Sequence, residues 1–415
     1  MNEQEALALL DARARFGQRM GLETMRGMLA ALDDFHQELR VVHVGGTNGK
    51  GSVCAMVASA LAASGRRTGL YVSPHLVRFH ERIQLDGVEI TGAQLARAAQ
   101  RCLPALEAFP EATYFEVATL LALRHFADEG AEVVVLEVGL GGRLDATNVL
   151  ERPLATAITN ISLEHTDVLG KTEEAIARVK AGILRPGVPC VTGATGEALA
   201  VIRARAAELG APLLVMGDDF VPATGEPDAD GQLLDVLGAR DHVALRIPLA
   251  GAHQAENAAV AVALLDLLRV PELAIRQGLA RARWPGRLQV VEGSPRILLD
   301  GAHNPAGAQA LAAHLKARGL RVVLVFGALA DKDWPAMVAE LAPHVRDAIV
   351  TRVPSARAAD PQDIARVFSM GGIFGMVVDE PGHALRTAEG IAGPDGTVLV
   401  TGSLYLVGDI LARLR

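Results

Sequence analysis

The sequence is short of cysteine, and this scarcity narrows the kinds of protein that it can encode. Its three cysteines, Cys54, Cys102 and Cys190, are spread over a chain of 415 residues. They are too few and too far apart for a disulfide framework or for a cysteine-based zinc site. We therefore expect a reducing compartment, with the three thiols as small core residues.

An apolar run long enough to cross a membrane is also missing. Half of the residues are hydrophobic, but charges or glycine interrupt every run well before the roughly 20 residues that a spanning helix needs. The N-terminal segment places acidic residues ahead of a short apolar run and has no small-residue cleavage pattern, so it does not resemble a secretory signal. It predicts an amphipathic surface helix, and we expect a cytoplasmic protein with no membrane partner.

The sequence has no excess of positive charge. Its formal net charge is −8, which argues against a broad basic surface and against nucleic acid as a partner. Small acidic substrates would therefore need locally placed cations. The chain also lacks internal repeats, low-complexity tails and sustained heptads. Its length and apolar content favour an enzyme of two or three domains.

Short β-branched runs alternate with helical stretches along the chain, which predicts a mostly parallel sheet covered by helices. The first series of predicted strands lies at 41–44, 133–138, 154–159, 188–192 and 213–216. A second series lies at 297–299, 322–326, 348–351 and 398–401, with a helix over 306–318. This second series predicts a smaller α/β domain.

The boundary between the two domains is expected at WPGR, residues 284–287, because Pro and Gly interrupt any continuing helix there. The predicted domains are 1–286 and 287–415. Residues 217–246 are rich in Gly, Asp and Pro and then alternate apolar with polar residues, so they predict a peripheral antiparallel hairpin. The function of that segment cannot be read from its sequence.

The most informative segment is a glycine-rich loop that follows a buried-strand pattern at residues 41–52, VVHVGGTNGKGS. Residues without Cβ let backbone N–H groups converge on an anion, and the positive end of the following helix favours a phosphate. Lys50 supplies a point charge, and Ser52 supplies a hydroxyl suited to magnesium. The loop departs from standard phosphate-loop spacing, because Val44 replaces the first glycine and Gly51 separates Lys50 from Ser52. A plain glycine-rich turn is the alternative, and phosphate binding alone does not name the reaction.

A second loop joins three glycines to two carboxylates directly after an apolar strand, at residues 137–148, EVGLGGRLDATN. Carboxylates at the carboxyl end of a parallel strand face the ligand crevice. Glu137 is therefore placed to reach a magnesium ion beside nucleotide phosphates held by 49–52. The alternative is a solvated turn, since acidic residues are common in loops.

Two further candidates follow the next predicted strand. His165 lies in a polar loop and could bind a metal through a neutral imidazole nitrogen, with a purely structural role as the alternative. Lys180 lies in an alanine-rich, apolar helical setting, where partial burial would lower the pKa of its amine and make it more reactive. The alternative for Lys180 is a surface lysine whose stem packs on apolar neighbours.

Three shorter motifs add polar and aromatic groups. In YVSPHL, Pro74 fixes the backbone and leaves Ser73 and His75 at a strand end. In TYFE, residues 113–116, an aromatic pair opens a helix and could pack a planar heterocycle or belong to the core. In the downstream domain, GRLQ and LLDGAHNP place Arg287, Asp300, His303 and Asn304 around a strand end and a helix start, as a second wall of a cleft.

Together these motifs resemble the folylpolyglutamate synthase and dihydrofolate synthase family, which belongs to the Mur ligase group. They run in chain order from about Gly21 to Gly408 and comprise GGTNGKGS, SPHL, TYFE, EVGLGGRLDATN, the segment with His165 and Lys180, WPGR, LLDGAHNP, ADKD and TGSLYLVG. The block at 137–148 is far more specific than any glycine loop. Two departures are Glu164, where relatives commonly have Asp, and Gly46, where Ala is frequent. The resemblance implies an α/β fold with a Mur-ligase-like P-loop domain and a smaller Rossmann-like C-terminal domain.

The resemblance also implies roles for individual residues. ATP would contact both domains, at Thr47, Asn48, Gly49, Lys50, Gly51, Ser52, Asn257, Arg287 and Asp300. Two magnesium ions would be served by Ser73, Glu137, His165 and a carbamylated Lys180, since carbamylation converts a cation into an anionic oxygen ligand. The pterin or folate site would be lined by Thr113, Tyr114, Phe115, Glu116, Leu144, Asp145 and Ala146. The incoming glutamate would meet His303 and Ser403, and the catalytic set would be Lys50, His165, Lys180 and His303.

The implied reaction is the ATP-driven addition of L-glutamate to dihydropteroate and to folates through an acyl phosphate. The RLDATN form of the second loop resembles bifunctional members of the family. The enzymatic alternatives are a monofunctional folylpolyglutamate synthase and a Mur ligase acting on a nucleotide-sugar peptide. A nucleotide-controlled switch without ligase chemistry is the alternative from another class. The expected partners are small molecules only, and the expected state is a monomer.

Overall fold

The computed structural model describes residues 1–17, 20–225 and 231–415, and these separate into two compact units. The first unit comprises Met1–His75, Phe79–Pro248 and Gln254–Arg283. The second comprises Leu76–Arg78, Leu249–His253 and Trp284–Arg415. The main division therefore falls at the start of the WPGR segment, and two short pieces from earlier in the chain also belong to the second unit.

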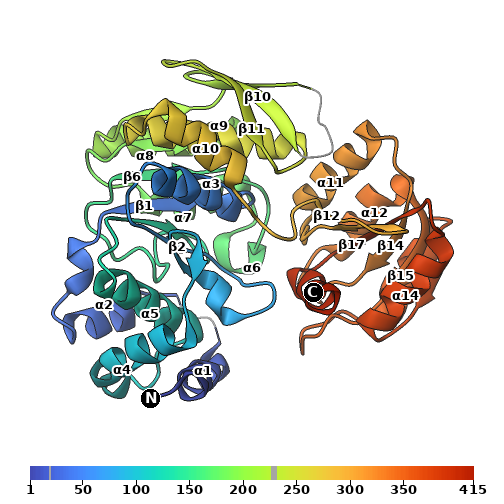
Figure 1. Ribbon diagram of the computed structural model, residues 1–415, viewed down its shortest axis with the longest axis horizontal. Coiled ribbons are helices and arrows are strands. Elements are labelled where there is room, and N and C mark those ends of the chain that lie inside the picture. Colours follow the sequence, from blue (N-terminus) through green and yellow to red (C-terminus); the bar gives the residue numbers. More distant parts are fainter. Residues whose placement is uncertain (18–19, 226–230) are drawn as a thin grey trace. The chain divides into compact units, whose positions relative to one another are not determined.

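The first unit is built on a sheet of eight described strands in the order β4-β3-β2-β5-β1-β6-β7-β8 (Figure 1). The strands from β2 to β8 in this order run parallel, and β3 and β4 add an antiparallel edge. Their bounds are β1 Val41–Gly45, β2 Thr68–Tyr71, β3 Ile83–Leu85, β4 Val88–Glu89, β5 Val133–Glu137, β6 Ala155–Ile158, β7 Cys190–Thr192 and β8 Leu213–Val215.

Helices cover both faces of this sheet, so every residue of β1 and β5 is buried. In Figure 1, α3 (Lys50–Ala63) and α10 (Glu272–Arg281) lie on one side of the sheet, and α4 (Gly92–Ala108) and α5 (Tyr114–Asp128) lie on the other. Gly278 allows α10 to approach α3 closely, because an added Cβ would lie 2.2 Å from Cα of Ala60. The C-terminal half of α3 is therefore packed closely against α10.

The remaining helices of the first unit are shorter or lie at its edges. They are α1 Glu3–Asp11, α2 Glu23–Ala30, α6 Thr166–Leu169, α7 Glu173–Lys180, α8 Gly196–Leu209 and α9 Ala252–Leu267, with 3₁₀ turns at Ala14–Phe16, Phe35–Glu38, Phe79–Arg82 and Ala181–Ile183. The predicted N-terminal amphipathic helix is confirmed as α1, which buries Ala6 and Leu10 and exposes most of its other residues.

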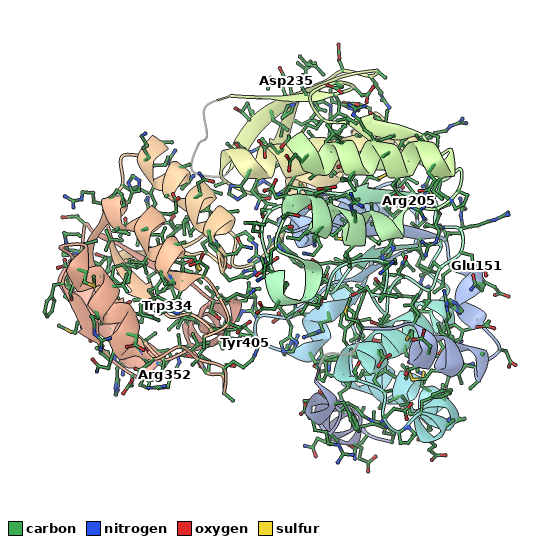
Figure 2. The ribbon with its side chains drawn as sticks, turned by 180° about the vertical axis from the view of Figure 1, so that it is seen from behind. Glu151, Arg205, Asp235, Trp334, Arg352 and Tyr405 are labelled. Carbon is green, nitrogen blue, oxygen red and sulfur yellow. The ribbon has the colours of Figure 1, made fainter. Side chains whose placement is uncertain are left out.

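A small antiparallel sheet with the order β11-β10-β9 completes the first unit. Its strands are β9 Val221–Thr224, β10 Gln232–Leu237 and β11 His242–Ile247, and Asp235 of β10, labelled in Figure 2, accepts a hydrogen bond from N of Ala244. The hairpin predicted within 217–246 is confirmed for β10 and β11, and β9 adds a third strand. Residues 226–230 of that segment lie outside the described chain.

A buried histidine fastens this small sheet to α9 and α10. The His242 side chain is fully buried, with Nε2 2.9 Å from Oδ2 of Asp266 and Nδ1 2.5 Å from Oε2 of Glu272. Arg240 also pairs with both carboxylates, at 3.6 and 3.2 Å, and Arg276 pairs with Glu272 at 2.8 Å. The hydrogen bond to Asp266 raises the pKa of His242, the carboxylate charges add to this, and burial opposes it.

We expect His242→Gln to lower the free energy of unfolding by about 2 kcal/mol at pH 6, because a charge-assisted contact is lost. A raised pKa means that the stabilisation by the imidazolium is complete below the unfolded-state pKa of about 6.5 and is lost as the pH rises through the folded-state value. Urea unfolding should therefore separate wild type from variant most at acidic pH and least in alkaline buffer. His383→Gln, at a side chain that is 67% exposed, is the control and should leave the free energy of unfolding nearly unchanged. A difference in the free energy of unfolding between wild type and His242→Gln that grows with pH would contradict this role of His242.

The second unit contains a sheet of six described strands in the order β12-β13-β17-β14-β15-β16. All neighbours run parallel except β12, which is antiparallel to β13. The strands are β12 Gln289–Val291, β13 Arg296–Leu299, β14 Val322–Phe326, β15 Val345–Val350, β16 Gly375–Val377 and β17 Thr397–Thr401. The helices are α11 Pro305–Ala317, α12 Trp334–Leu341, α13 Pro361–Met370, α14 Pro381–Ala392 and α15 Leu404–Leu414, with a 3₁₀ turn at Ala342–His344.

Alternate residues of this second sheet face two separate cores. Leu324 of β14 packs into a core with α11, α12 and α13, whereas Val325 packs into a core with α14 and α15. Leu76 and Val77 also pack against the latter core. Figure 2 labels Trp334 at the start of α12 and Tyr405 in the first turn of α15.

Every strand core predicted from the sequence is a strand in the structure, with shifts of a few residues at the ends. The missed strands are β3, β4, β9, β12 and β16, which are short and lack a continuous β-branched run, and the sequence predicts β2 only as a short strand ahead of Pro74, without a start residue. The three cysteines are free and buried, as expected. None of the helices in the described chain is both long and apolar enough to span a bilayer.

Candidate functional site

The loop between β1 and α3 forms the centre of the candidate site. Its backbone is fixed by Asn160, whose carbonyl accepts from N of Thr47 at 2.8 Å and whose Oδ1 accepts from N of Asn48 at 2.9 Å. Lys50 begins α3, and its Nζ donates to the carbonyl of Thr47 at 2.8 Å. Ser52 lies in the first turn of α3 and is buried. The loop is therefore preorganised beside the N-terminus of a helix, where anions bind.

The structure brings Asn257 of α9 to this loop. Gly49 has a φ of 84°, and a Cβ added to it would lie 2.1 Å from Oδ1 of Asn257. The Asn257 side chain is buried and donates from Nδ2 to Oε1 of Gln254 at 3.1 Å. Gly49 is thus required twice, for its positive φ and for the space that Asn257 occupies.

We expect Gly49→Ala to weaken binding of ADP by roughly 10- to 100-fold, because left-handed backbone strain costs about 1–2 kcal/mol and the added Cβ also displaces Asn257. Isothermal titration calorimetry would measure the affinity. Gly65→Ala is the matched control, since Gly65 also has a φ of 84° but has no heavy atom within 4 Å of an added Cβ. It should lose stability and keep its affinity. Equal losses of affinity in both variants would contradict a local effect.

Two neighbouring parallel strands deliver a carboxylate and a serine to the same edge of the sheet. Glu137 ends β5, is only 4% exposed, and accepts at Oε2 from N of Ser73 at 2.8 Å. Ser73 follows β2, which pairs with β5 through Tyr71 and Leu136. His165 begins the short helix α6 with a φ of 51°, and its Nε2 is 4.0 Å from Oε1 of Glu164.

These donors fit a magnesium ion that shares its coordination sphere with phosphate and water. In the described chain, no group of three His, Cys, Asp or Glu side chains could hold a metal by itself. Magnesium does not require such a cage, because it usually keeps several waters and takes one or two carboxylates plus substrate phosphates. A buried carboxylate beside a serine and the glycine loop meets that requirement.

Lys180 connects the end of α7 to the glycine loop. Its side chain is buried, and Nζ donates to the carbonyl of Gly46 at 2.7 Å. Burial first, and then the charge of Lys50, lowers the pKa of Lys180 to about 7, while Glu164 and Asp145 act in the opposite direction. Much of this amine is therefore neutral near physiological pH, which is the form that can react as a nucleophile.

The loop after β5 is folded around Asp145. Oδ2 of Asp145 accepts from N of Leu140 at 2.7 Å, and Oδ1 accepts from N and Oγ1 of Thr147. Nε2 of His43 lies 2.8 Å from the same Thr147 hydroxyl, and burial lowers the pKa of His43 to about 3. Burial also raises the pKa of Asp145, against the hydrogen bonds that it accepts. Both carboxylate oxygens of Asp145 therefore accept hydrogen bonds from residues of the loop itself. Leu144 and Ala146 are its neighbours in the chain.

The TYFE motif divides into a helix cap and an aromatic pair. Thr113 and Glu116 form a buried capping box at the start of α5, with Oγ1 of Thr113 donating to Oε2 of Glu116 at 2.7 Å. Phe115 packs against Gly139, where an added Cβ would lie 2.3 Å from Cζ of the ring. Phe115 therefore offers its ring to the loop after β5, whereas the Tyr114 ring packs against Phe79 and Arg82.

The second unit gathers its own predicted residues at the carboxyl ends of β13 and β17. Asp300 accepts from N of Leu288 and N of Ala302, both at 2.9 Å. Arg287 lies beside it, since a Cβ on Gly301 would meet Nη1 of Arg287 at 2.4 Å. Nδ1 of His303 is 2.8 Å from the carbonyl of Gly301. Ser403 caps α15, and its Oγ accepts from N of Tyr405 at 3.2 Å.

Sequence analysis missed several residues that build the site. Asn160, His43 and Thr147 act through hydrogen bonds to residues far away in the chain, and Arg82 lies buried beside Tyr114. Asn160 is a polar residue shortly after the end of β6, but nothing in the sequence indicates that it binds the backbone of Thr47 and Asn48. His43 and Thr147 lie within the two glycine-rich segments singled out from the sequence, but neither composition nor spacing indicated that they contact each other.

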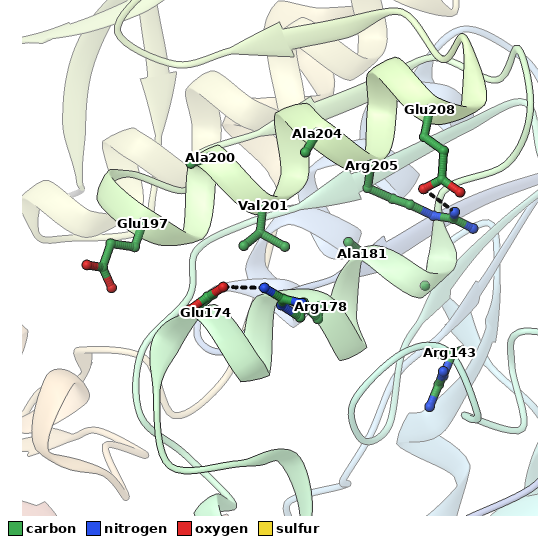
Figure 3. A pocket seen from close by; sticks show the side chains of 11 residues that line it. Arg143, Glu174, Arg178, Ala181, Glu197, Ala200, Val201, Ala204, Arg205 and Glu208 are labelled. Carbon is green, nitrogen blue, oxygen red and sulfur yellow. Dashed lines mark hydrogen bonds and ion pairs between the residues drawn. The ribbon is translucent and has the colours of Figure 1, made fainter.

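A separate hollow in the first unit carries none of the predicted site residues. It is a cavity of about 770 Å³ between α7 and α8 (Figure 3). Its charged lining consists of Arg143, Glu174, Arg178, Glu197, Arg205 and Glu208. Two pairs of these neutralise each other, Glu174 with Arg178 and Arg205 with Glu208. We assign it no role in the chemistry.

Two family models match the chain. The model described as Mur ligase middle domain matches residues 44–265, and the model described as Mur ligase, glutamate ligase domain matches residues 286–404. The dihydrofolate synthase/folylpolyglutamate synthase of Bacillus subtilis is 35% identical, over 99% of both chains. A probable bifunctional folylpolyglutamate synthase/dihydropteroate synthase of Haloferax volcanii is 39% identical over 99% of this chain, which spans 50% of that relative.

Solved structures agree with these matches. The Escherichia coli FolC protein in complex with DHPP and ADP matches with a TM-score of 0.91 and 35% identity, over 100% of this chain and 98% of that one. The folylpolyglutamate synthase of Mycobacterium tuberculosis complexed with ADP matches with a TM-score of 0.92 and 31% identity, over 99% of this chain and 98% of that one. The likeness therefore extends over both units.

Proposed function

Because the chain belongs to the Mur ligase family, and within it to the folylpolyglutamate synthase and dihydrofolate synthase group, we propose that it adds L-glutamate to dihydropteroate and to tetrahydrofolates at the expense of ATP. Relatives with both names and relatives with bound ADP support this proposal. The observation that carries it is the contact between Lys180 and the glycine loop at Gly46. A nucleotide switch has no need of a buried, reactive amine at its phosphate loop.

The proposed reaction forms an amide through an acyl phosphate. An oxygen of the substrate carboxylate attacks the γ-phosphorus of ATP in line and releases ADP, and the amine of glutamate then attacks the acyl carbon and releases phosphate. Lys50 and the backbone N–H groups of residues 46–52 offset the charge on the phosphates. No covalent bond to the enzyme is required, so positioning and electrostatics supply most of the acceleration.

Magnesium, when bound, would neutralise charge on the phosphoryl group, and we assign Ser73, Glu137, His165 and a carbamylated Lys180 as the residues that hold it. We keep Asn257, Arg287 and Asp300 as nucleotide contacts and His303 and Ser403 as glutamate contacts. Tyr114 and Phe115 would pack the pterin ring. We further propose that residues 1–286 bind ATP and the pterin and that the protein is a cytoplasmic monomer.

A test of the function uses purified protein with ATP, magnesium, glutamate and either dihydropteroate or tetrahydrofolate. We expect ADP release with both pterins and a product heavier by one glutamyl group in mass spectrometry. ADP release with tetrahydrofolate alone would leave a folylpolyglutamate synthase without the dihydrofolate synthase activity. ATP turnover at full rate without glutamate and without an amide product would instead favour a nucleotide switch.

A further inference from the structure

Arg82 is a buried cation of the first unit, and the described residues provide no carboxylate that pairs with it. Its side chain lies at the end of the 3₁₀ turn Phe79–Arg82, and the residue is 8% exposed. Nε donates to Nδ1 of His75 at 2.9 Å, and the guanidinium lies over the rings of Tyr114 and Phe79, with 5.3 and 6.0 Å from Cζ to the centroids. Within residues 1–17, 20–225 and 231–415, no Asp or Glu forms an ion pair with it.

A buried charge without a counter-charge is costly, so proteins rarely keep one without a use. Arg124, a partly buried arginine of this unit that also lies over an aromatic ring, makes the contrast clear. Arg124 lies over the ring of Phe35 at 4.3 Å, its side chain is 15% exposed, and it pairs with Asp128. Arg82 has the aromatic stack without the carboxylate. Its guanidinium also offers a planar fork of donors, which suits a carboxylate.

The position of Arg82 places this fork beside the proposed chemistry. Its carbonyl accepts from N of Val72 at 3.0 Å, and the next residue, Ser73, donates from N to Glu137. The ring under the guanidinium belongs to Tyr114, which precedes the Phe115 that packs on the loop after β5. Arg82 thus neighbours the aromatic pair through its side chain and the segment that carries Ser73 through its backbone.

We infer that Arg82 binds the carboxylate of the pterin substrate that becomes phosphorylated, an inference that rests on the proposed function. The Tyr114 ring and the His75 nitrogen fix the guanidinium plane, so that two N–H groups can hold one carboxylate in a set orientation. The uncharged end of a pteroate molecule is aromatic, which matches the rings around this cation. When an oxygen of the carboxylate attacks the γ-phosphorus, the new C–O–P bond forms and the bond from phosphorus to ADP breaks. Arg82 stays protonated throughout and transfers no proton.

The test compares Arg82→Lys and Arg82→Gln with wild type, and it uses Arg124→Lys as the matched control. We expect calorimetry with AMPPCP present to give affinities for dihydropteroate and tetrahydrofolate that are weaker by roughly 30-fold or more in both Arg82 variants, because a charge-assisted fork is lost. Affinity for AMPPCP alone should be unchanged in the same samples, which also reports that the variants are folded. Arg124→Lys should lower the melting temperature and leave both pterin affinities intact.

Comparison of the two pterins shows which carboxylate Arg82 binds. Dihydropteroate has a single carboxylate, the one that reacts, whereas a folate also carries the α-carboxylate of its glutamyl group. Loss of affinity for tetrahydrofolate alone would overturn our inference, because Arg82 would then serve the α-carboxylate. Wild-type affinity for dihydropteroate in Arg82→Lys and Arg82→Gln would overturn it as well. If wild type itself bound neither pterin, the proposed function would fail, an outcome separate from a failure at Arg82.

Discussion

Lys180→Ala is expected to form amide product at least roughly 10³-fold more slowly than wild type, because it removes both the buried amine and any anionic ligand made from it. The amine is buried and touches the glycine loop through Gly46, so no neighbouring group can replace it. Added bicarbonate should not restore the variant, whereas small carboxylates such as acetate could fill the vacated space and restore part of the rate. Steady-state assays of ADP release coupled to product analysis would measure these rates.

Lys171→Ala is the matched control, since Lys171 is exposed just before α7. It should behave as wild type. The lowered pKa of Lys180, about 7, adds a dependence on pH, because only the neutral amine takes up carbon dioxide and its share grows as pH rises through 7. Wild-type enzyme depleted of carbon dioxide should therefore regain activity with bicarbonate more completely at pH 8 than at pH 6. Wild-type activity in Lys180→Ala would end the proposal of a carbamate.

Glu137→Gln is expected to lower the rate by roughly 10²- to 10³-fold and to raise the magnesium concentration needed for half-maximal activity. Glutamine preserves the size of the side chain and an oxygen to accept from N of Ser73, so the fold should survive, while the negative charge is lost. Titration of the rate with magnesium at saturating ATP would show both effects. The change tests the metal role of the carboxylate separately from its hydrogen bond.

Glu132→Gln provides the control for this change, because Glu132 is exposed just ahead of the same strand β5. Its rate and magnesium dependence should match wild type. A Glu137→Gln enzyme with a normal magnesium requirement would show that this carboxylate only positions the loop that carries Ser73. The metal would then have to be held by other groups.

The sequence predicted the fold wherever burial leaves a strong local pattern. Strands such as β5 and β14, buried on both faces, show as apolar runs, VVVL and VVLVF, and the mostly parallel α/β class follows from the alternation of such runs with helices. By contrast β2, with the sequence TGLY, is fully buried yet has a glycine at its centre. That glycine accommodates the ring of Phe126, a packing requirement that only the folded structure reveals.

Candidate site residues could be proposed from the sequence where they belong to a local motif. They could not be proposed where their position depends on contacts with residues distant in the chain. The glycine loop, Glu137 and Lys180 stand out because glycine spacing, strand ends and an apolar helix are local signals. Asn160 and Arg82 show no such signal, since the structural role of Asn160 depends on a hydrogen bond to Asn48 and the role proposed for Arg82 depends on the lack of a carboxylate partner among the described residues. A partner that lies over a hundred residues away, as Asn160 does from Asn48, cannot be read from spacing.

Because Leu76–Arg78 belong to the second unit, they limit where two related chains can be recombined. Leu76 packs so closely there that a Cβ on Gly408 would lie 2.0 Å from its carbonyl oxygen, and Gly286 touches its side chain. A chimera joined at Trp284 would therefore set three residues of one parent against a surface shaped by the other. Recombination between relatives should therefore succeed only when residues 76–78 and 249–253 come from the same parent as residues 284–415.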